Sequence, residues 1–142
     1  MNINCCNTAL NAISVDAQTL EANNSIVFSV NTIDTGNQIN HAENSQVISI
    51  IRPGIYLINF SASLLGTAAE VVTVNMLNKG IPLQGALASA TTAVGETTNV
   101  AFSYILCVPR SCMAINNSAS LTFTVNNAVT VSSSTVSVVR IP

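Results

Sequence analysis

The side chains in this sequence that could carry out catalysis are few and widely spaced. A serine triad would need the single histidine, His41, beside Asp16 or Asp34 and close to an activated serine. The Gly-x-Ser-x-Gly turn that exposes such a serine does not occur in the chain. A lone histidine in a polar segment is usually solvated. We therefore expect His41 to be exposed and the chain not to be an enzyme.

Two acidic residues flank a predicted turn at Gly36. Asp34 precedes this glycine and Glu43 follows it, so their carboxylates could approach each other. With asparagine carbonyl oxygens they are candidate calcium ligands, because Ca²⁺ binds hard oxygen atoms. The expected alternative is a solvated loop that carries two acids. We predict no other metal site and no cofactor.

The four cysteines form two pairs in the sequence. Cys107 and Cys112 flank a four-residue segment, and if this segment is a hairpin loop a disulfide between them is sterically feasible. Two free thiols are the alternative. Neither cysteine pair has the two-residue spacing of zinc-binding loops, so we expect the adjacent Cys5 and Cys6 to link chains rather than to hold a metal.

The composition excludes several classes of function. Of 142 residues, 49% are hydrophobic and only 7% are charged, with a formal net charge of −2. Such a chain has no basic surface for nucleic acid, so no nucleic-acid partner is expected. Few surface charges also protect poorly against association. We therefore expect part of the surface to be buried in a closed homo-oligomer.

Neither a membrane span nor a secretory signal is visible in the sequence. The longest apolar stretch, residues 47–65, is interrupted by Arg52, Pro53 and Gly54. The N-terminal residues lack the basic region of a signal peptide. This leaves two alternatives: a protein made in the cytoplasm, or a part of a longer secreted protein.

The rest of the chain reads as short strands separated by turns. The expected strands cover residues 9–15, 26–30, 46–51, 55–65, 71–77, 81–87, 99–108, 113–125 and 129–141. The Ala-rich segment 86–94 sustains no 3.6-residue period, so no helix is expected there. Asn78, Lys79 and Gly80 predict a tight hairpin turn. Strands at about ten-residue spacing predict an all-β sandwich. We expect a flexible N-terminal segment, residues 1–8, and one domain, residues 9–142.

The strand after Pro53 and Gly54 shows the clearest alternation. In this strand and in segment 99–108, one set of alternate positions carries the large apolar or aromatic side chains and the other set carries mixed, mostly smaller ones. Each strand should therefore have one core face and one outward face. The residues expected in the core are Tyr56, Ile58, Phe60, Phe102 and Tyr104. The residues expected on the opposite face are Leu57, Asn59, Ser61, Ala101, Ser103 and Ile105.

Three segments carry a resemblance to a known family. Residues 53–60 match a Gly-x-Tyr core strand, residues 72–83 a strand, Asn-x-Gly turn and strand, and residues 136–141 a closing strand. They resemble the C1q/tumour-necrosis-factor-type jelly roll. Within it they are most similar to the C-terminal domains of bacterial collagen-like spore-surface glycoproteins of the BclA type.

The resemblance implies a two-sheet antiparallel jelly roll that forms a homotrimer, with one sheet facing the threefold axis. The six residues opposite the core would then be trimer-interface candidates. The implied function is structural: a trimerising head of a spore-surface (exosporium) or other surface-layer filament, located on the spore or extracellular surface. Its partners would be copies of itself and other spore-coat or surface-layer proteins.

The alternative function is a ligand-binding trimeric head, adhesin-like or lectin-like, with a site in its apical loops. Sugar sites usually combine an aromatic platform with acids and amides. The chain has no tryptophan, and Tyr56 and Tyr104 are both expected within strands. The composition therefore favours the structural function over the ligand-binding one.

Overall fold

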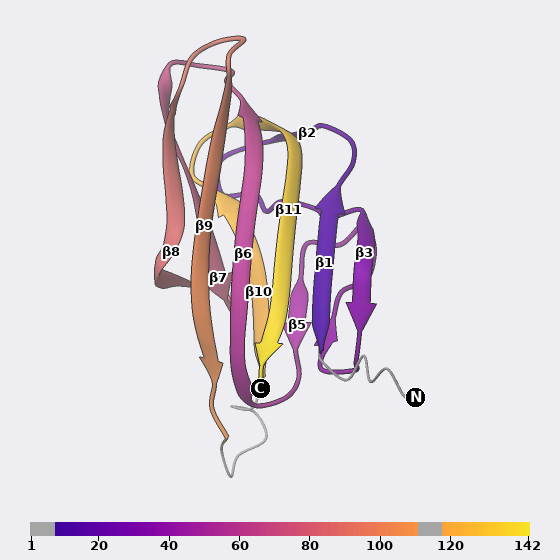
Figure 1. Ribbon diagram of the computed structural model, residues 1–142. Coiled ribbons are helices and arrows are strands. Elements are labelled where there is room, and N and C mark those ends of the chain that lie inside the picture. The colour runs from indigo at the N-terminus through magenta and orange to yellow at the C-terminus, as the bar shows by residue number, and fades with distance from the viewer. Residues whose placement is uncertain (1–7, 111–117) are drawn as a thin grey trace.

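The computed structural model describes residues 8–110 and 118–142, which form strands and turns (Figure 1). Within these ranges there is no helix long and apolar enough to cross a membrane. The strands are β1 (Ala9–Ser14), β2 (Gln18–Leu20), β3 (Val30–Thr35), β4 (Ile39–Asn40), β5 (Ile48–Ile50), β6 (Gly54–Leu65), β7 (Glu70–Asn78), β8 (Ile81–Thr92), β9 (Thr97–Val108), β10 (Ala119–Val125) and β11 (Val129–Ile141).

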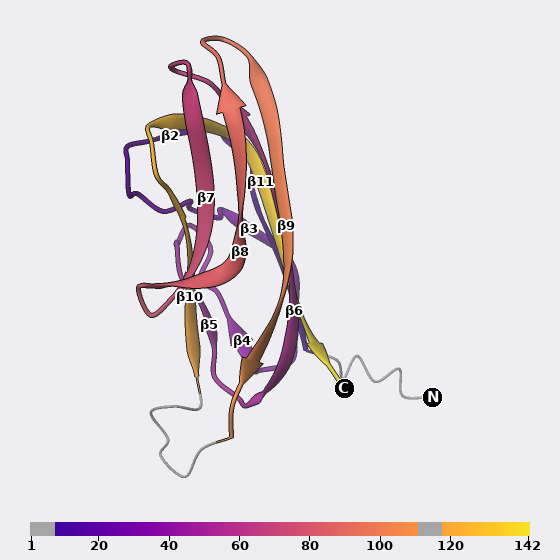
Figure 2. The ribbon, with the colours of Figure 1, turned by 90° about the vertical axis from the view of Figure 1, so that its left-hand side faces the viewer.

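The strands form two antiparallel sheets that pack face to face (Figure 2). One sheet has six strands in the order β3-β1-β11-β6-β9, with β2 also paired to β11. The other has five strands in the order β4-β5-β10-β7-β8. The predicted all-β sandwich of two antiparallel sheets is confirmed.

An aromatic cluster joins the two sheets across the core. Phe60 on β6 stacks on Phe123 of β10, with ring centroids 4.8 Å apart and planes 13° apart. Phe28 meets Phe123 edge-on at 5.7 Å. Tyr56 and Ile58 are fully buried beside Phe60, so the alternation along β6 has the predicted parity.

Gly54 begins β6 in a conformation that favours glycine. Its φ is +153°, and a Cβ atom there would lie 2.8 Å from Nε of Arg140. Any other residue at this position would have an unfavourable φ, and its Cβ atom would lie too close to the Arg140 side chain.

The turn between β7 and β8 is a two-residue hairpin, as predicted. Asn78 pairs with Ile81, and the intervening Lys79 and Gly80 have φ values of +52° and +82°. Two positive φ angles are the signature of a type I′ turn, which matches the twist of the flanking strands. Segment 86–94, for which no helix was expected, lies mostly in β8.

The hairpin expected between Cys107 and Cys112 involves residues outside the described ranges, and the described strands on either side of it, β9 and β10, do not pair with each other. Cys107 is exposed on β9, which pairs with β6, whereas β10 belongs to the other sheet. Cys112, Cys5 and Cys6 lie outside the described residues, so the disulfide and the interchain link stay predictions.

Residues 26–29 are not a separate strand, although Ile26 and Phe28 are buried at alternate positions as a strand pattern would suggest, and Val30 is the first residue of β3. The backbone N–H of Ile26 donates to Phe123 in one sheet, and that of Ser29 donates to Ile13 in the other. This segment therefore crosses from sheet to sheet, and only isolated bridges form along it.

Replacing Gly66 by alanine should destabilise the end of the sandwich where two loops meet. Its N–H donates to the carbonyl of Glu96 at 3.0 Å, and a Cβ atom would overlap the backbone carbonyl of Ala93. We expect Gly66→Ala to lower the free energy of unfolding by about 1–3 kcal/mol in a denaturant titration. An unchanged midpoint would mean that the loop containing Ala93 shifts without cost.

Candidate functional site

The candidate functional site is the outer face of the six-stranded sheet, the face turned away from the five-stranded sheet. Outer-face side chains alternate with core side chains along each strand. The six interface candidates all lie on this face: Leu57, Asn59 and Ser61 on β6, and Ala101, Ser103 and Ile105 on β9. Their role between protomers stays a prediction.

Cross-strand pairing adds side chains of β11 that the sequence analysis did not single out. Ser137 lies opposite Asn59, and Thr135 lies opposite Ser61. The clue in the sequence was the Ser/Thr alternation around the buried Val136. We call the following set the small polar rows: Asn59, Ser61, Ala101, Ser103, Thr135 and Ser137.

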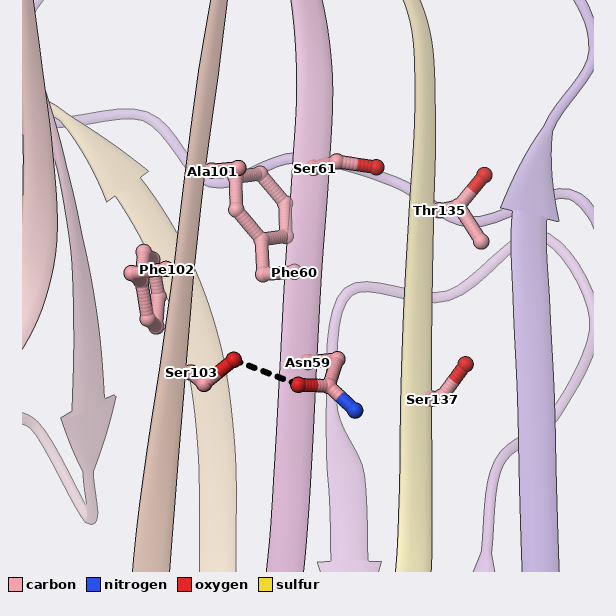
Figure 3. Close-up of a pocket in the computed structure, with 8 residues that line it drawn as sticks. All are labelled: Asn59, Phe60, Ser61, Ala101, Phe102, Ser103, Thr135 and Ser137. Atoms are coloured by element: carbon pink, nitrogen blue, oxygen red, sulfur yellow. Dashed lines mark hydrogen bonds between the residues drawn. The ribbon is translucent and has the colours of Figure 1, made fainter.

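The small polar rows line a shallow depression of about 420 Å³ (Figure 3). A second depression of about 330 Å³ adjoins it and is lined in part by Ser63, Asn99 and Ser133. The side chains around both are short, so the outer face is hollowed along its centre. A surface of this shape can receive a convex partner.

Hydrogen bonds within the outer face satisfy its asparagine carbonyl groups. Ser103 Oγ donates to Oδ1 of Asn59 at 2.5 Å, and Ser63 Oγ donates to Oδ1 of Asn99 at 2.8 Å. In Figure 3 the amide nitrogen of Asn59 points away from Ser103, toward β11. Burying this face would therefore cost less than burying the same groups unpaired.

The outer face carries no charge across four neighbouring strands. β1, β6 and β9 contain no charged residue, and β11 contains only Arg140. Arg140 pairs with the buried Tyr56 and so points to the inner side of the sheet. Covering the outer face removes no ion from water, which avoids the largest cost of burying polar surface.

Arg140 and Tyr56 form the polar end of the core beneath this face. The Tyr56 hydroxyl donates to the backbone carbonyl of Arg52 at 2.9 Å. Burial raises the pKa of the Tyr56 phenol above its ordinary value, and the Arg140 guanidinium partly offsets this effect. Tyr56 is therefore protonated at neutral pH and acts as a hydrogen-bond donor. Nε of Arg140 is buried without a hydrogen-bond partner.

One end of the outer face is apolar. Ile105 is 63% exposed and Ile55 is 46% exposed, which is unusual for isoleucine in a folded domain. Cross-strand pairing places Leu57 between Ile105 and Val139, and Ile141 beside Ile55. We call these five residues the apolar end. A contiguous exposed apolar patch usually marks a contact with another protein.

A second candidate surface lies where β8 and β9 form the edges of the two sheets. The two strands run side by side at one side of the sandwich (Figures 1 and 2) and neither contains a charged residue. The side chains between them are only partly buried, and we call them the β8–β9 seam: Leu83, Ala88, Ala90, Phe102 and Tyr104. Phe102 and Tyr104, expected in the core, thus lie at its border.

The opposite edges of the sheets are short. β4 has two residues, and β3 has six and carries Asp34, whereas β8 and β9 have twelve each. Long uncharged edge strands invite pairing with another chain, and soluble proteins usually shorten them or place charges on them. The edge formed by β8 and β9 is therefore the one at which contact with another chain is most expected.

The structure adds no support for the calcium hypothesis. Asp34 lies in β3, while Glu43 accepts a hydrogen bond from the backbone N–H of Asn31 at 2.9 Å. Within residues 8–110 and 118–142, no three His, Cys, Asp or Glu side chains gather to hold a metal ion. Asp34 and Glu43 remain candidates from the sequence alone.

The expectation that His41 is solvated is wrong. Its side chain is only 7% exposed, and its ring meets Phe28 edge-on at 6.1 Å. The ring nitrogens face an amide oxygen of Asn31 and the backbone carbonyl of Ser45. The polar sequence around His41 concealed that this segment folds over Phe28. Because neither nitrogen faces a serine hydroxyl or a carboxylate, the arrangement is not a catalytic triad.

Comparisons with known proteins give matches at the level of structure only. No protein-family model and no curated protein matches the chain. The globular domain of zebrafish complement 1qA protein aligns with a TM-score of 0.67 at 9% identity, covering 95% of this chain and 98% of that one. Eiger TNF from S. frugiperda aligns with a TM-score of 0.70 at 8% identity, covering 96% and 93%.

The PRD1 vertex protein P5 aligns with a TM-score of 0.61 at 11% identity, covering 94% of this chain and 96% of that one. Identities this low establish the fold alone, which is the C1q/TNF-like jelly roll. A fold shared by a complement domain, a TNF and a vertex protein does not decide function, so function must be argued from the surfaces of this chain.

Proposed function

We propose that this chain is a structural assembly module that forms a homotrimer. The outer face of one protomer packs against the β8–β9 seam of the next. A ring of three needs two different surfaces on each protomer, because only a twofold contact can pair a surface with itself. The observation that carries the proposal is the uncharged outer face over four neighbouring strands.

The number of protomers follows from the family resemblance. C1q/TNF-type jelly rolls are homotrimers with one sheet toward the threefold axis, and the similar solved structures support the same fold here. The candidate residues on β6 and β9 then lie between protomers, with Ser137 and Thr135 of β11 beside them. The proposed interface contains the three predicted residues of β6 and the three of β9, and it adds Thr135 and Ser137 from a third strand, β11.

Apolar burial drives the association. The apolar end contributes roughly 25 cal/mol for each Å² removed from water. The small polar rows add contact area at low cost, since their asparagine carbonyls already accept hydrogen bonds within the protomer. An obligate interface of this kind buries on the order of 2,000 Å² or more in total.

A lysine at Ile105 tests the interface directly. Ile105 is 63% exposed in the protomer, and a charge there would have to be buried on assembly. We expect Ile105→Lys to abolish the trimer in sedimentation equilibrium. The matched control is Val71→Lys: Val71 is 51% exposed on β7, on the side of the five-stranded sheet turned away from the core, and its variant should keep the trimer. Trimers in both variants would contradict the proposed surface.

We propose further that the trimer is the head of a bacterial spore-surface or other surface-layer filament. The support is the resemblance of residues 53–60, 72–83 and 136–141 to BclA-type domains, and these segments contribute to β6, the β7–β8 hairpin and β11. Immunogold labelling of intact spores should place the protein at the outer surface. Labelling confined to the cytoplasm would exclude this location.

The ligand-binding alternative has less support. Its apical loops would need an aromatic platform. Four of the six aromatic residues lie in the core, namely Phe28, Tyr56, Phe60 and Phe123, and the other two belong to the β8–β9 seam. The structural function therefore accounts for more of the surface than a sugar-binding head would.

A further inference from the structure

One end of the sandwich carries three of the four basic residues of the chain. Arg140 is the penultimate residue of β11, Arg110 follows β9 by two residues, and Arg52 precedes β6 by two. Both β9 and β11 pair with β6 in antiparallel fashion, so the ends of these two strands lie beside the start of β6 (Figure 1). Three arginines that are far apart in the sequence therefore share one end of the molecule, which we call the arginine end.

Two of these arginines, Arg110 and Arg140, line a hollow of about 270 Å³ at the arginine end. The hollow is also lined by Gly54 and Val108, the residue pair with which β6 begins and β9 ends. Among the described residues that line it, none is acidic. Drug-sized ligands occupy pockets of about 300–1,000 Å³, so a hollow of this size suits a small ligand.

Arg140 supplies a buried donor to this hollow. Its Nε is buried, and within residues 8–110 and 118–142 it has no hydrogen-bond partner. Gly54 leaves room for it, since a Cβ atom there would lie 2.8 Å from Nε. Its cross-strand partner on β6 is Tyr56, whose hydroxyl donates its proton to the carbonyl of Arg52. A buried charged donor without an acceptor is costly, so an acceptor that binds here would stabilise the fold.

The carboxylates of the chain lie elsewhere. Four of the six acidic residues lie near the opposite end of the sandwich, where β6 ends and β11 begins: Asp16, Glu21, Glu70 and Glu96. Of the other two, Asp34 lies on β3, which β1 separates from β11, and Glu43 accepts a hydrogen bond from the backbone N–H of Asn31. Positive charge thus gathers at the arginine end, which favours an anion there.

We propose that the hollow between Arg110 and Arg140 binds a small oxyanion, a molecule that presents a carboxylate or a phosphate group. Guanidinium groups match the oxygens of both groups with paired N–H donors. The buried Nε of Arg140 supplies a fixed donor, and the exposed Arg110 supplies a second positive charge at the opening.

This site goes beyond the assembly function and does not need the trimer. It lies at the strand ends, whereas the proposed contact between protomers uses the outer face and the β8–β9 seam. Ile55 borders both surfaces, but Arg140 points to the inner side of the six-stranded sheet.

Isothermal titration calorimetry at neutral pH and constant ionic strength tests the site, with inorganic phosphate and succinate as probes. We expect saturable binding with a dissociation constant of about 1 mM or tighter. Arg110→Gln should weaken binding about tenfold or more, the loss expected for one hydrogen bond to a charged group. The matched control is Arg52→Gln, which removes the same charge at the same end from a residue that does not line the hollow, and it should bind as the wild type does.

A second measurement locates the anion in the wild-type chain. In nitrogen–proton NMR the Nε–H signal of Arg140 should shift during the titration, whereas that of Arg52 should not. Binding of phosphate alone or of succinate alone would support the site and identify its ligand. No saturable binding of either probe, equal weakening in Arg52→Gln and Arg110→Gln, or an unmoved Arg140 signal would each overturn the proposal.

Discussion

Replacing Phe60 by alanine should lower the free energy of unfolding by about 3–5 kcal/mol, as for other large-to-small changes in a core. The Phe60 side chain is 2% exposed. Its ring stacks on that of Phe123 with centroids 4.8 Å apart, and its centroid lies 5.3 Å from that of Phe102, whose plane is tilted by 33°. Because Phe60 and Phe123 come from different sheets, the lost ring opens a cavity where the sheets meet. Reversible denaturant unfolding at a fixed protomer concentration measures the change.

The adjacent residue provides the control. Ser61 follows Phe60 on β6 but is exposed on the outer face, so Ser61→Ala should change the free energy of unfolding by less than about 1 kcal/mol. Similar losses in both variants would mean that position on the strand does not decide burial. A loss below about 1 kcal/mol for Phe60→Ala would contradict the assignment of its ring to the core.

Local pattern was sufficient to predict β6 and its two faces. Large apolar groups at every second position after Gly54 can be buried together only if the segment is a strand, and the burial of Tyr56 and Phe60 has this parity. The β7–β8 hairpin was equally local, since Lys79 and Gly80 sit at the two positions that require positive φ. In each case the determining residues are neighbours in the sequence.

The errors came from contacts between distant residues. The short spacing between Cys107 and Cys112 suggested that the strands on either side pair with each other, whereas β9 pairs with β6 in one sheet and β10 pairs with β7 in the other. His41 was misjudged for a similar reason, because its burial depends on Phe28, thirteen positions earlier along the chain. The residues next to His41 in the sequence are mostly polar, whereas in the folded chain it contacts the buried core residue Phe28.

The outer face shows how far a candidate site can be derived. Alternation predicted which residues of β6 and β9 share it, but the contribution of β11 depends on a register that shifts between Val131 and Ser133. The alternation around Val136 indicated that Thr135 and Ser137 share a face away from the core, but only the register in the structure places Thr135 opposite Ser61 and Ser137 opposite Asn59.

The protein should sediment as a trimer whose mass is the same at low salt and at about 1 M salt. At the higher concentration the Debye length is roughly 3 Å, so attraction between exposed charges is almost fully screened. The chain has four basic and six acidic residues, and none lies on the outer face of β1, β6, β9 or β11 or in the β8–β9 seam. Association through these two surfaces has no ion pairs to lose.

The same physical argument predicts that the protomers do not remain folded alone. Separating them would expose the apolar end and the β8–β9 seam together, and the stability of an obligate oligomer rises with protomer concentration. The unfolding midpoint should therefore increase on concentration while staying insensitive to salt. A folded monomer at either salt concentration would remove the assembly function and favour the ligand-binding head. Dissociation only at high salt would place the contact at the charged loops, because the uncharged sheet faces contain nothing that salt can screen.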